Sequence, residues 1–107
     1  MSESVRVMNN LVFDLYQLRT FRAVAISGNF TRAAAELGYS QPTVTHQIKA
    51  LERKLGASLL ERTRFSRKAV LTDAGRCVLA YSERLLALAE ETIAAVRLSS
   101  SRLPPSA

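Results

Sequence analysis

A two-residue connection between two helical segments is the feature that most constrains this fold. The first segment, Thr31 to Leu37, is rich in alanine and is followed by Gly38. Only Gly38 and Tyr39 separate it from Ser40, where the stretch SQPTVTHQIKALE begins. We expect so short a connection to make the two helices cross steeply rather than lie antiparallel. The small side chains of the first segment would let the second helix approach closely.

The second segment has the pattern of a regular amphipathic helix. It is predicted to run from Ser40 as N-cap to about Leu55, with Gly56 as its stop. Pro42 is acceptable in the first turn, where backbone N–H groups have no partner inside the helix. One apolar stripe with a period of 3.6 residues consists of Val44, Ile48, Leu51 and Leu55.

The opposite face of this helix is uncharged over its first two turns. Two crossed helices with a tight turn form a helix-turn-helix, whose second helix places its N-terminal turns in the DNA major groove. The Gln41 amide can bond adenine N6 and N7 together, although Gln41 could also be solvated and Pro42 could be purely structural. We predict that the base-recognition residues are Gln41, Pro42, Thr43, Thr45 and His46.

Positive charge is concentrated in one part of the chain. The formal net charge is +6, and residues 41–72 hold seven Lys and Arg against two acidic residues. Such a concentration favours a polyanionic partner, although any one of these residues could simply be solvated. We predict contacts to DNA phosphates or the minor groove from Thr31, Arg32, Lys49, Arg62, Arg64, Arg67 and Lys68. Arg53 and Lys54 lie further along the helix and are left out of this prediction.

Two short strands are predicted after Gly56. Leu59 and Leu60 precede a polar, basic turn, and residues 69–71 follow it. A basic hairpin directly after a recognition helix is a wing, which would lie along the phosphate backbone or enter the minor groove.

Two further helices complete the predicted architecture. The first runs from about Leu15 to Ile26 and stops at Gly28. One side of this helix is predicted to hold Leu15, Leu18, Phe21 and Ala25. The last is capped by Thr72 and reaches Arg97 or Leu98. We expect a mainly α winged helix-turn-helix, with a three-helix core and a short β-hairpin, followed by this long helix.

The long helix carries two apolar stripes, more than its own domain needs. They are Val78, Tyr81, Leu85, Leu88 and Ala95, and Leu79, Leu86, Ala89, Ile93 and Val96. We therefore predict that it also packs on a second copy of the chain. The predicted dimerisation residues are Val78, Tyr81, Leu85, Leu88 and Ile93. The chain divides into an N-terminal extension (1–13), the winged helix-turn-helix (14–71), the long helix (72–98) and a hinge or flexible tail (99–107).

From residue 14 to 98 the sequence resembles the N-terminal domain of a LysR-type transcriptional regulator. The resemblance rests on FTRAAAELGYSQP, QIKALE, LLER and LTDAG, in that order. It implies dimerisation through the long helix, called the linker helix, and a pseudo-palindromic operator in double-stranded DNA. It also implies that a small-molecule effector would bind only a C-terminal domain that this sequence does not contain.

Two departures from the family pattern bear on DNA contacts. His46 follows Thr45 where the family most often has Arg, which affects base preference. The segment from Arg62 to Leu71 is about two residues longer than the usual family wing, which affects the reach of Arg64 and Arg67.

Other functions receive less support from the sequence. With one His, one Cys and no phosphate-binding glycine loop, we expect neither an enzyme nor a bound metal or cofactor. Cys77 is predicted to be a packing residue, and Asn29 a turn or cap residue rather than a glycosylation site. The sequence lacks a secretion signal or membrane span, so we expect a cytoplasmic protein. The alternative is a helical interaction module whose basic face binds an acidic protein or a membrane surface.

Overall fold

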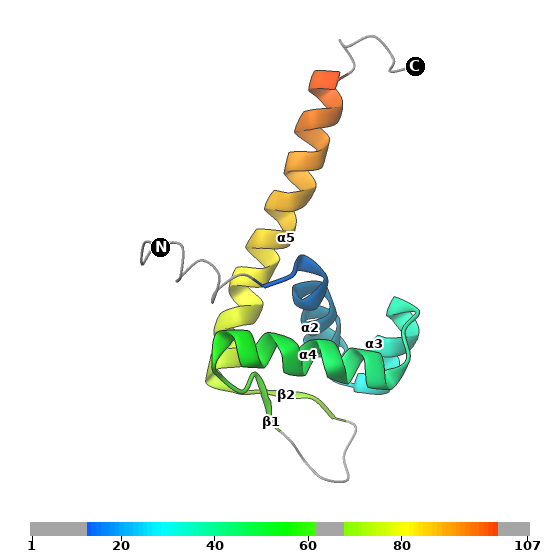
Figure 1. The fold of residues 1–107 in the computed structure, drawn as a ribbon, viewed down its shortest axis with the longest axis vertical. Helices are drawn as coiled ribbons and strands as arrows, with labels where there is room; N and C mark the ends of the chain where they lie inside the picture. Colours follow the sequence, from blue (N-terminus) through cyan, green and yellow to red (C-terminus); the bar gives the residue numbers. More distant parts are fainter. Residues whose placement is uncertain (1–12, 62–67, 101–107) are drawn as a thin grey trace, which may run out of the picture.

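The computed structural model describes residues 13–61 and 68–100, which form three crossed helices, a small hairpin and one long projecting helix (Figure 1). The fold is the predicted winged helix-turn-helix followed by a long helix. Its elements in chain order are α2 (Leu15–Ser27), α3 (Phe30–Leu37), α4 (Gln41–Leu55), β1 (Leu60–Glu61), β2 (Val70–Leu71) and α5 (Asp73–Ser100). The predicted N-terminal extension therefore lies almost entirely outside the described residues, as does the centre of the predicted wing.

Side-chain caps and glycines set the ends of the first three helices. The Asp14 carboxylate accepts a hydrogen bond from the Tyr16 N–H, and the Gln17 side chain accepts one from the Asp14 N–H. Asn29 Oδ1 accepts from the Arg32 N–H at 2.9 Å, which confirms Asn29 as a cap and starts α3 one residue earlier than predicted. Gly38 has a φ of 72°, a left-handed conformation that favours glycine, so it ends α3 and begins the tight turn.

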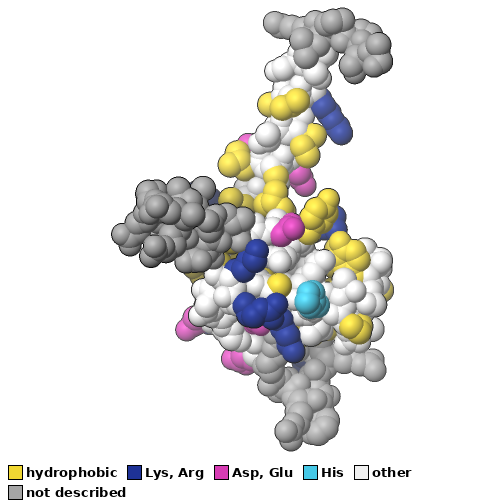
Figure 2. All heavy atoms as spheres, in the orientation of Figure 1, with side chains coloured by type: hydrophobic (Ala, Val, Ile, Leu, Met, Phe, Trp, Pro, Cys, Tyr) yellow, Lys and Arg dark blue, Asp and Glu magenta, His cyan; other side chains and the backbone are white. Residues whose placement is uncertain are grey.

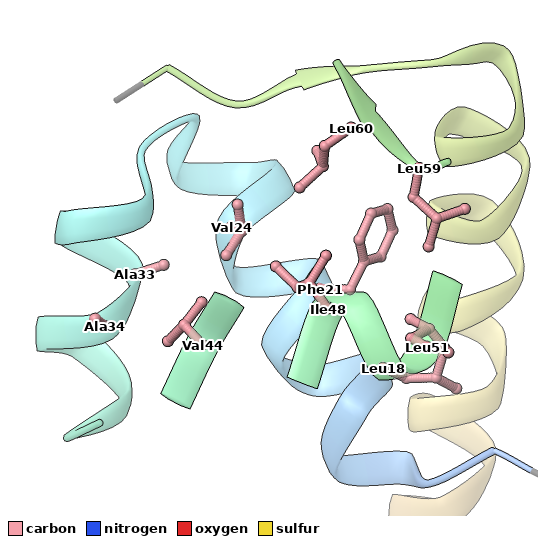
Figure 3. Packing of buried hydrophobic residues seen from close by; sticks show 10 residues of the cluster. All are labelled: Leu18, Phe21, Val24, Ala33, Ala34, Val44, Ile48, Leu51, Leu59 and Leu60. Carbon is pink, nitrogen blue, oxygen red and sulfur yellow. The ribbon is translucent and has the colours of Figure 1, made fainter. Parts of the chain in front are cut away.

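The core lies where α2, α3, α4 and β1 meet (Figure 3). It consists of Leu18, Phe21, Val24, Ala33, Ala34, Val44, Ile48, Leu51, Leu59 and Leu60. The predicted stripe of α4 is confirmed for its first three members, and Leu55 is partly buried against the same cluster. On the predicted side of α2, Leu15 is 46% exposed, whereas Leu18 and Phe21 are buried. The helix enters the core one turn later, and Val24 supplies its last buried side chain.

The two strands pair antiparallel, as predicted, with Leu60 opposite Leu71 and Glu61 opposite Val70. Backbone pairing continues beyond β2 to the connection between α2 and α3. The Ala69 N–H donates to the Gly28 carbonyl oxygen at 2.9 Å, and Lys68 forms an antiparallel bridge with Asn29. The base of the hairpin is therefore fixed to the start of α3 as well as to its own partner strand.

The hairpin is also joined closely to the base of α5. The Thr72 hydroxyl donates to the Ser58 carbonyl oxygen at 2.6 Å and accepts from the Gly75 N–H at 2.9 Å. The Thr72 N–H donates to the Leu59 carbonyl oxygen at 3.1 Å. A Cβ atom at Gly75 would overlap that same oxygen, so only glycine allows α5 to approach this closely.

Helix α5 packs on the domain only through its first turns. Its 28 residues span about 42 Å, and Arg22 of α2 forms an ion pair with Glu83 at 3.8 Å. Every residue from 90 to 100 is exposed. The helix continues through Ser99 and Ser100, so the predicted boundary at residue 98 was wrong. Serine is only a mild helix opponent, and the prolines that exclude helix lie further on, at 104 and 105.

Replacing Gly75 with alanine is expected to destabilise the fold by about 1–3 kcal/mol because the added methyl group overlaps the Leu59 carbonyl. Helix propensity alone would have the opposite sign, since alanine gains about 1 kcal/mol over glycine inside a helix. Urea unfolding of Gly75→Ala measures the sign directly. The control is Ala80→Gly at an exposed position of α5, which should cost about 1 kcal/mol. A Gly75→Ala variant as stable as the wild type would contradict the close approach.

Candidate nucleic-acid interface

The first turn of α4 presents its polar side chains to solvent. Ser40 Oγ accepts a hydrogen bond from the Thr43 N–H at 3.2 Å, and its hydroxyl lies 2.8 Å from that of Thr43. Gln41 and Pro42 follow the cap and are exposed. The cap uses the Ser40 and Thr43 side chains, and the residues of this first turn remain exposed.

Four of the five predicted base-recognition residues lie together. They line one shallow depression on the exposed side of α4, with Lys49 at its end. The depression is formed by Gln41, Pro42, Thr45, His46 and Lys49. In Figure 2 the single histidine of the chain lies on this face beside a group of Lys and Arg side chains.

Thr43, the fifth predicted base-recognition residue, is exposed but does not line this depression. The Thr43 hydroxyl is also paired with Ser40. Thr43 therefore takes part in the N-cap of α4 while its side chain remains exposed.

A buried hydrogen bond that the sequence analysis did not identify fixes the rotation of α4. Thr20 of α2 is fully buried, and its hydroxyl donates to Gln47 Oε1. Gln47 is half-buried on the side of α4 that faces α2. The bond lies among apolar contacts, where a sliding or turning helix would leave the Thr20 hydroxyl unpaired at a cost of about 1–3 kcal/mol. A threonine inside an otherwise apolar stripe was the available signal.

A second tether holds the turn between α3 and α4. Arg19 Nη2 donates to the Tyr39 hydroxyl at 2.8 Å. The same guanidinium lies over the Tyr16 ring, with Cζ 5.1 Å from the ring centroid. Arg19 thus links the first turn of α2 to the two-residue connection that determines how α3 and α4 cross.

The predicted phosphate-contacting residues fall into three groups. Thr31 and Arg32 are exposed in the first turn of α3, and the bridge between Lys68 and Asn29 brings Lys68 beside them. Lys49 lies away from this corner, on the face of α4. Arg62, Arg64 and Arg67 lie outside the described residues.

The predicted dimerisation residues differ in their surroundings. Val78 packs against the core of its own domain. The other four are exposed on α5: Tyr81, Leu85, Leu88 and Ile93. Hydrophobic side chains are spaced along the projecting part of this helix (Figure 2). Cys77 is also exposed, so its prediction as a buried packing residue was wrong for the single chain.

The described ranges hold neither a metal-binding cluster nor a membrane-spanning helix. Among residues 13–61 and 68–100, no three His, Cys, Asp or Glu side chains form a group that could hold a metal ion. No helix of those two ranges has both the length and the apolar content that crossing a bilayer requires.

Comparison with known proteins agrees with this arrangement. Residues 15–76, more than half of the chain, match the family described as "Bacterial regulatory helix-turn-helix protein, lysR family". The chain belongs to the LysR family. A LysR-family relative, the probable RuBisCO transcriptional regulator of Cyanidioschyzon merolae (strain NIES-3377 / 10D), is 47% identical over 89 residues. The match covers 83% of this chain and 29% of that protein, so the chain spans less than a third of the relative's length.

Solved structures of LysR-family proteins share the fold. The crystal structure of the CbnR_DBD–DNA complex matches with a TM-score of 0.77 and 41% identity, covering 82% of this chain and 99% of that one. The crystal structure of the BenM_DBD/catB site 1 DNA complex matches with a TM-score of 0.77 and 35% identity, covering 83% and 98%. In both comparisons the similarity to this LysR-family chain covers more than four fifths of its residues.

The tether between Thr20 and Gln47 can be measured with a double-mutant cycle. Thr20→Val is expected to cost about 1 kcal/mol of unfolding free energy because it removes the hydrogen bond and keeps the shape. Gln47→Leu should cost more in the wild type than in the Thr20→Val background, because only the wild type retains a buried hydroxyl without its partner. Urea unfolding of the four proteins gives the coupling. Additive single effects would mean that the two side chains do not hold α4 together.

Proposed function

We propose that this chain binds double-stranded DNA sequence-specifically as a homodimer, as the DNA-binding part of a longer LysR-family regulator of transcription. The observation that carries the proposal is the depression at the exposed start of α4, where four small or uncharged side chains gather beside Lys49. A surface built to attract any polyanion would be cationic throughout. Here the N-terminal half of the depression is uncharged, as base recognition requires.

Each residue of the depression has a chemistry that suits a base edge. The Gln41 amide is the group for a bidentate adenine contact, and Pro42 and Thr45 offer apolar surface to thymine methyl groups. His46 reaches a base or a phosphate from the next turn. Thr43, whose hydroxyl is paired with Ser40, contributes its methyl group.

Phosphate contacts would orient the domain on the duplex. Thr31 and Arg32 lie at the start of α3, where the helix dipole favours an anion, and Lys68 lies beside them. Lys49 would hold the strand that borders the base-recognition surface. Arg62, Arg64 and Arg67 are proposed as wing contacts on the strength of their sequence positions alone.

The exposed apolar residues of α5 support a dimer. Tyr81 and Leu88 are each 58% exposed, and Ile93 is 52% exposed. Large hydrophobic side chains along a projecting helix gain free energy by packing on a second copy. A twofold dimer presents two α4 helices, so its operator would be pseudo-palindromic with half-sites a helical turn or a multiple of it apart.

The remaining proposals concern the intact regulator. Relatives extend well beyond the region matched here, and we propose that a small-molecule effector acts on that further part. We also propose that the regulator works in the cytoplasm, in the same compartment as the DNA that it binds.

Replacing Gln41 with alanine is expected to reduce discrimination between DNA sequences by about 1–3 kcal/mol. A duplex selected from a randomised library, and a scrambled duplex of the same composition, are compared by fluorescence anisotropy across a salt series. Gln41→Ala should lose the preference and keep the salt slope. Lys49→Ala should weaken binding to both duplexes and reduce the slope by about one. Equal binding of wild type to every duplex would instead support the module with a merely basic face.

Replacing Leu88 with glutamate is expected to shift the chain from dimer to monomer, because a charge would be buried in the proposed helix–helix contact. Leu88 is exposed in the single chain, so the fold should survive. Sedimentation equilibrium measures the dimer dissociation constant. Ala94→Glu, on the side of α5 away from both apolar stripes, is the matched control and should remain dimeric. A dimer unaffected by Leu88→Glu would place the interface elsewhere.

A further inference from the structure

We propose that Arg53 contacts the DNA backbone between the base-recognition end of α4 and the wing, extending the interface a full turn beyond Lys49. The proposal rests on the proposed DNA binding. It assigns a role to a residue that the sequence analysis left out, on evidence that only the arrangement of α4 and the hairpin provides.

Arg53 lies on the same face of α4 as the base-recognition residues. It follows Lys49 by four residues and His46 by seven, which are the spacings of neighbours along one side of a helix. A second depression, formed by Lys49, Glu52, Arg53, Gly56, Ala57 and Ser58, borders the one that contains Gln41. Lys49 lines both depressions, so the two together form one strip along the exposed side of α4.

The position of this strip determines what it would meet on DNA. The start of α4 is proposed to enter the major groove, and the hairpin that begins at Leu60 is proposed to reach the neighbouring minor groove. Adjacent grooves of a duplex are separated by one phosphate backbone. Arg53 and residues 56–58 lie on the path from α4 to β1, so they would face that backbone.

The surface around Arg53 leaves room for a strand to approach. Gly56 has open space where a Cβ would be, and Ala57 and Ser58 are small. The loop is held in place by Glu52, whose carboxylate accepts from the Leu59 N–H at 2.7 Å and from Ser58 Oγ at 3.5 Å. The acid thus has a structural role, although its charge and the carbonyl end of α4 both oppose an anion. A cation is needed here if a phosphate is to approach.

Arg53 has its charge available for such a contact. Within the part of the chain that the structure describes, Lys49, Arg53 and Lys54 form no ion pair, whereas Arg22 pairs with Glu83 and Arg76 with Asp73. Lys and Arg side chains gather on this face of α4 (Figure 2). Lys54 differs from Arg53 in one respect that matters: it lines neither depression.

That difference supplies a matched pair of variants. Arg53→Ala and Lys54→Ala each remove one exposed, unpaired cation from adjacent positions of one helix, so the loss of net charge is identical. For the selected duplex, Arg53→Ala should lower the slope of log K against log salt by about 0.9, the effect of one lost phosphate contact. Lys54→Ala should leave the slope unchanged. Thermal unfolding of both variants verifies that the fold is retained.

A scan with single methylphosphonates, which neutralise one phosphate at a time, locates the contact. Neutralising the phosphates between the major-groove half-site and the adjacent minor groove should weaken wild type and leave Arg53→Ala unaffected. Equal slopes for Arg53→Ala and wild type, or equal losses in both alanine variants, would overturn the assignment to Arg53. A wild-type chain that binds no duplex would overturn the proposed function itself.

Discussion

The burial of one face of α4 is the constraint on which the rest of the molecule depends. Val44, Ile48 and Leu51 are completely buried against α2 and α3. Because a helix is a rigid cylinder with fixed angular spacing, burying those three side chains also determines which residues face outward. The sides that carry Gln41, His46 and Lys49 are thus set by apolar packing, and the Thr20 hydrogen bond resists the remaining freedom to rotate. On α4, the side chains proposed to recognise DNA therefore lie on a different side of the helix from those whose burial stabilises the fold.

The loops and hydrogen bonds around α4 fix the positions of α3 and the hairpin relative to it. A capped start at Ser40 and a glycine turn before it fix the crossing of α3 and α4, while Glu52 holds the loop that leads into β1. Backbone pairing of Ala69 with Gly28 then returns the hairpin to the start of α3. Each of these hydrogen bonds stabilises the fold by about 1 kcal/mol net. Hydrogen bonds are directional, so together they fix how the elements are placed relative to one another. Apolar packing alone is not directional and would not fix these positions.

Much of this architecture was predictable from the sequence because its signals are local. Helix caps, stopping glycines and the 3.6-residue stripe of α4 depend on residues within one or two turns. The two strands were likewise located from short apolar runs on either side of a polar turn. Several of the features that the sequence did not reveal depend on distant parts of the chain. The exposure of Leu15 and the partnership of Thr20 with Gln47 depend on how α2 meets α4. The grouping of Lys68 with Thr31 and Arg32 requires a backbone bridge between residues 39 positions apart. The pairing of the Thr43 and Ser40 hydroxyls is local, but residue type alone does not reveal it.

The hairpin is joined to the base of α5, and this limits how a dimer could adjust to operators whose half-sites are spaced differently. Thr72 is bonded to Ser58 and Leu59, and the lack of a side chain at Gly75 lets the helix rest against the backbone of the Leu59 peptide. Wing and helix therefore tilt as one body. An operator with altered spacing could not be met by a pivot at this junction, which would break the two hydrogen bonds from Thr72 to Ser58 and Leu59. Either the DNA or the outer turns of α5 would have to bend instead. In the described structure those outer turns are exposed and make no contact with the domain that would oppose bending.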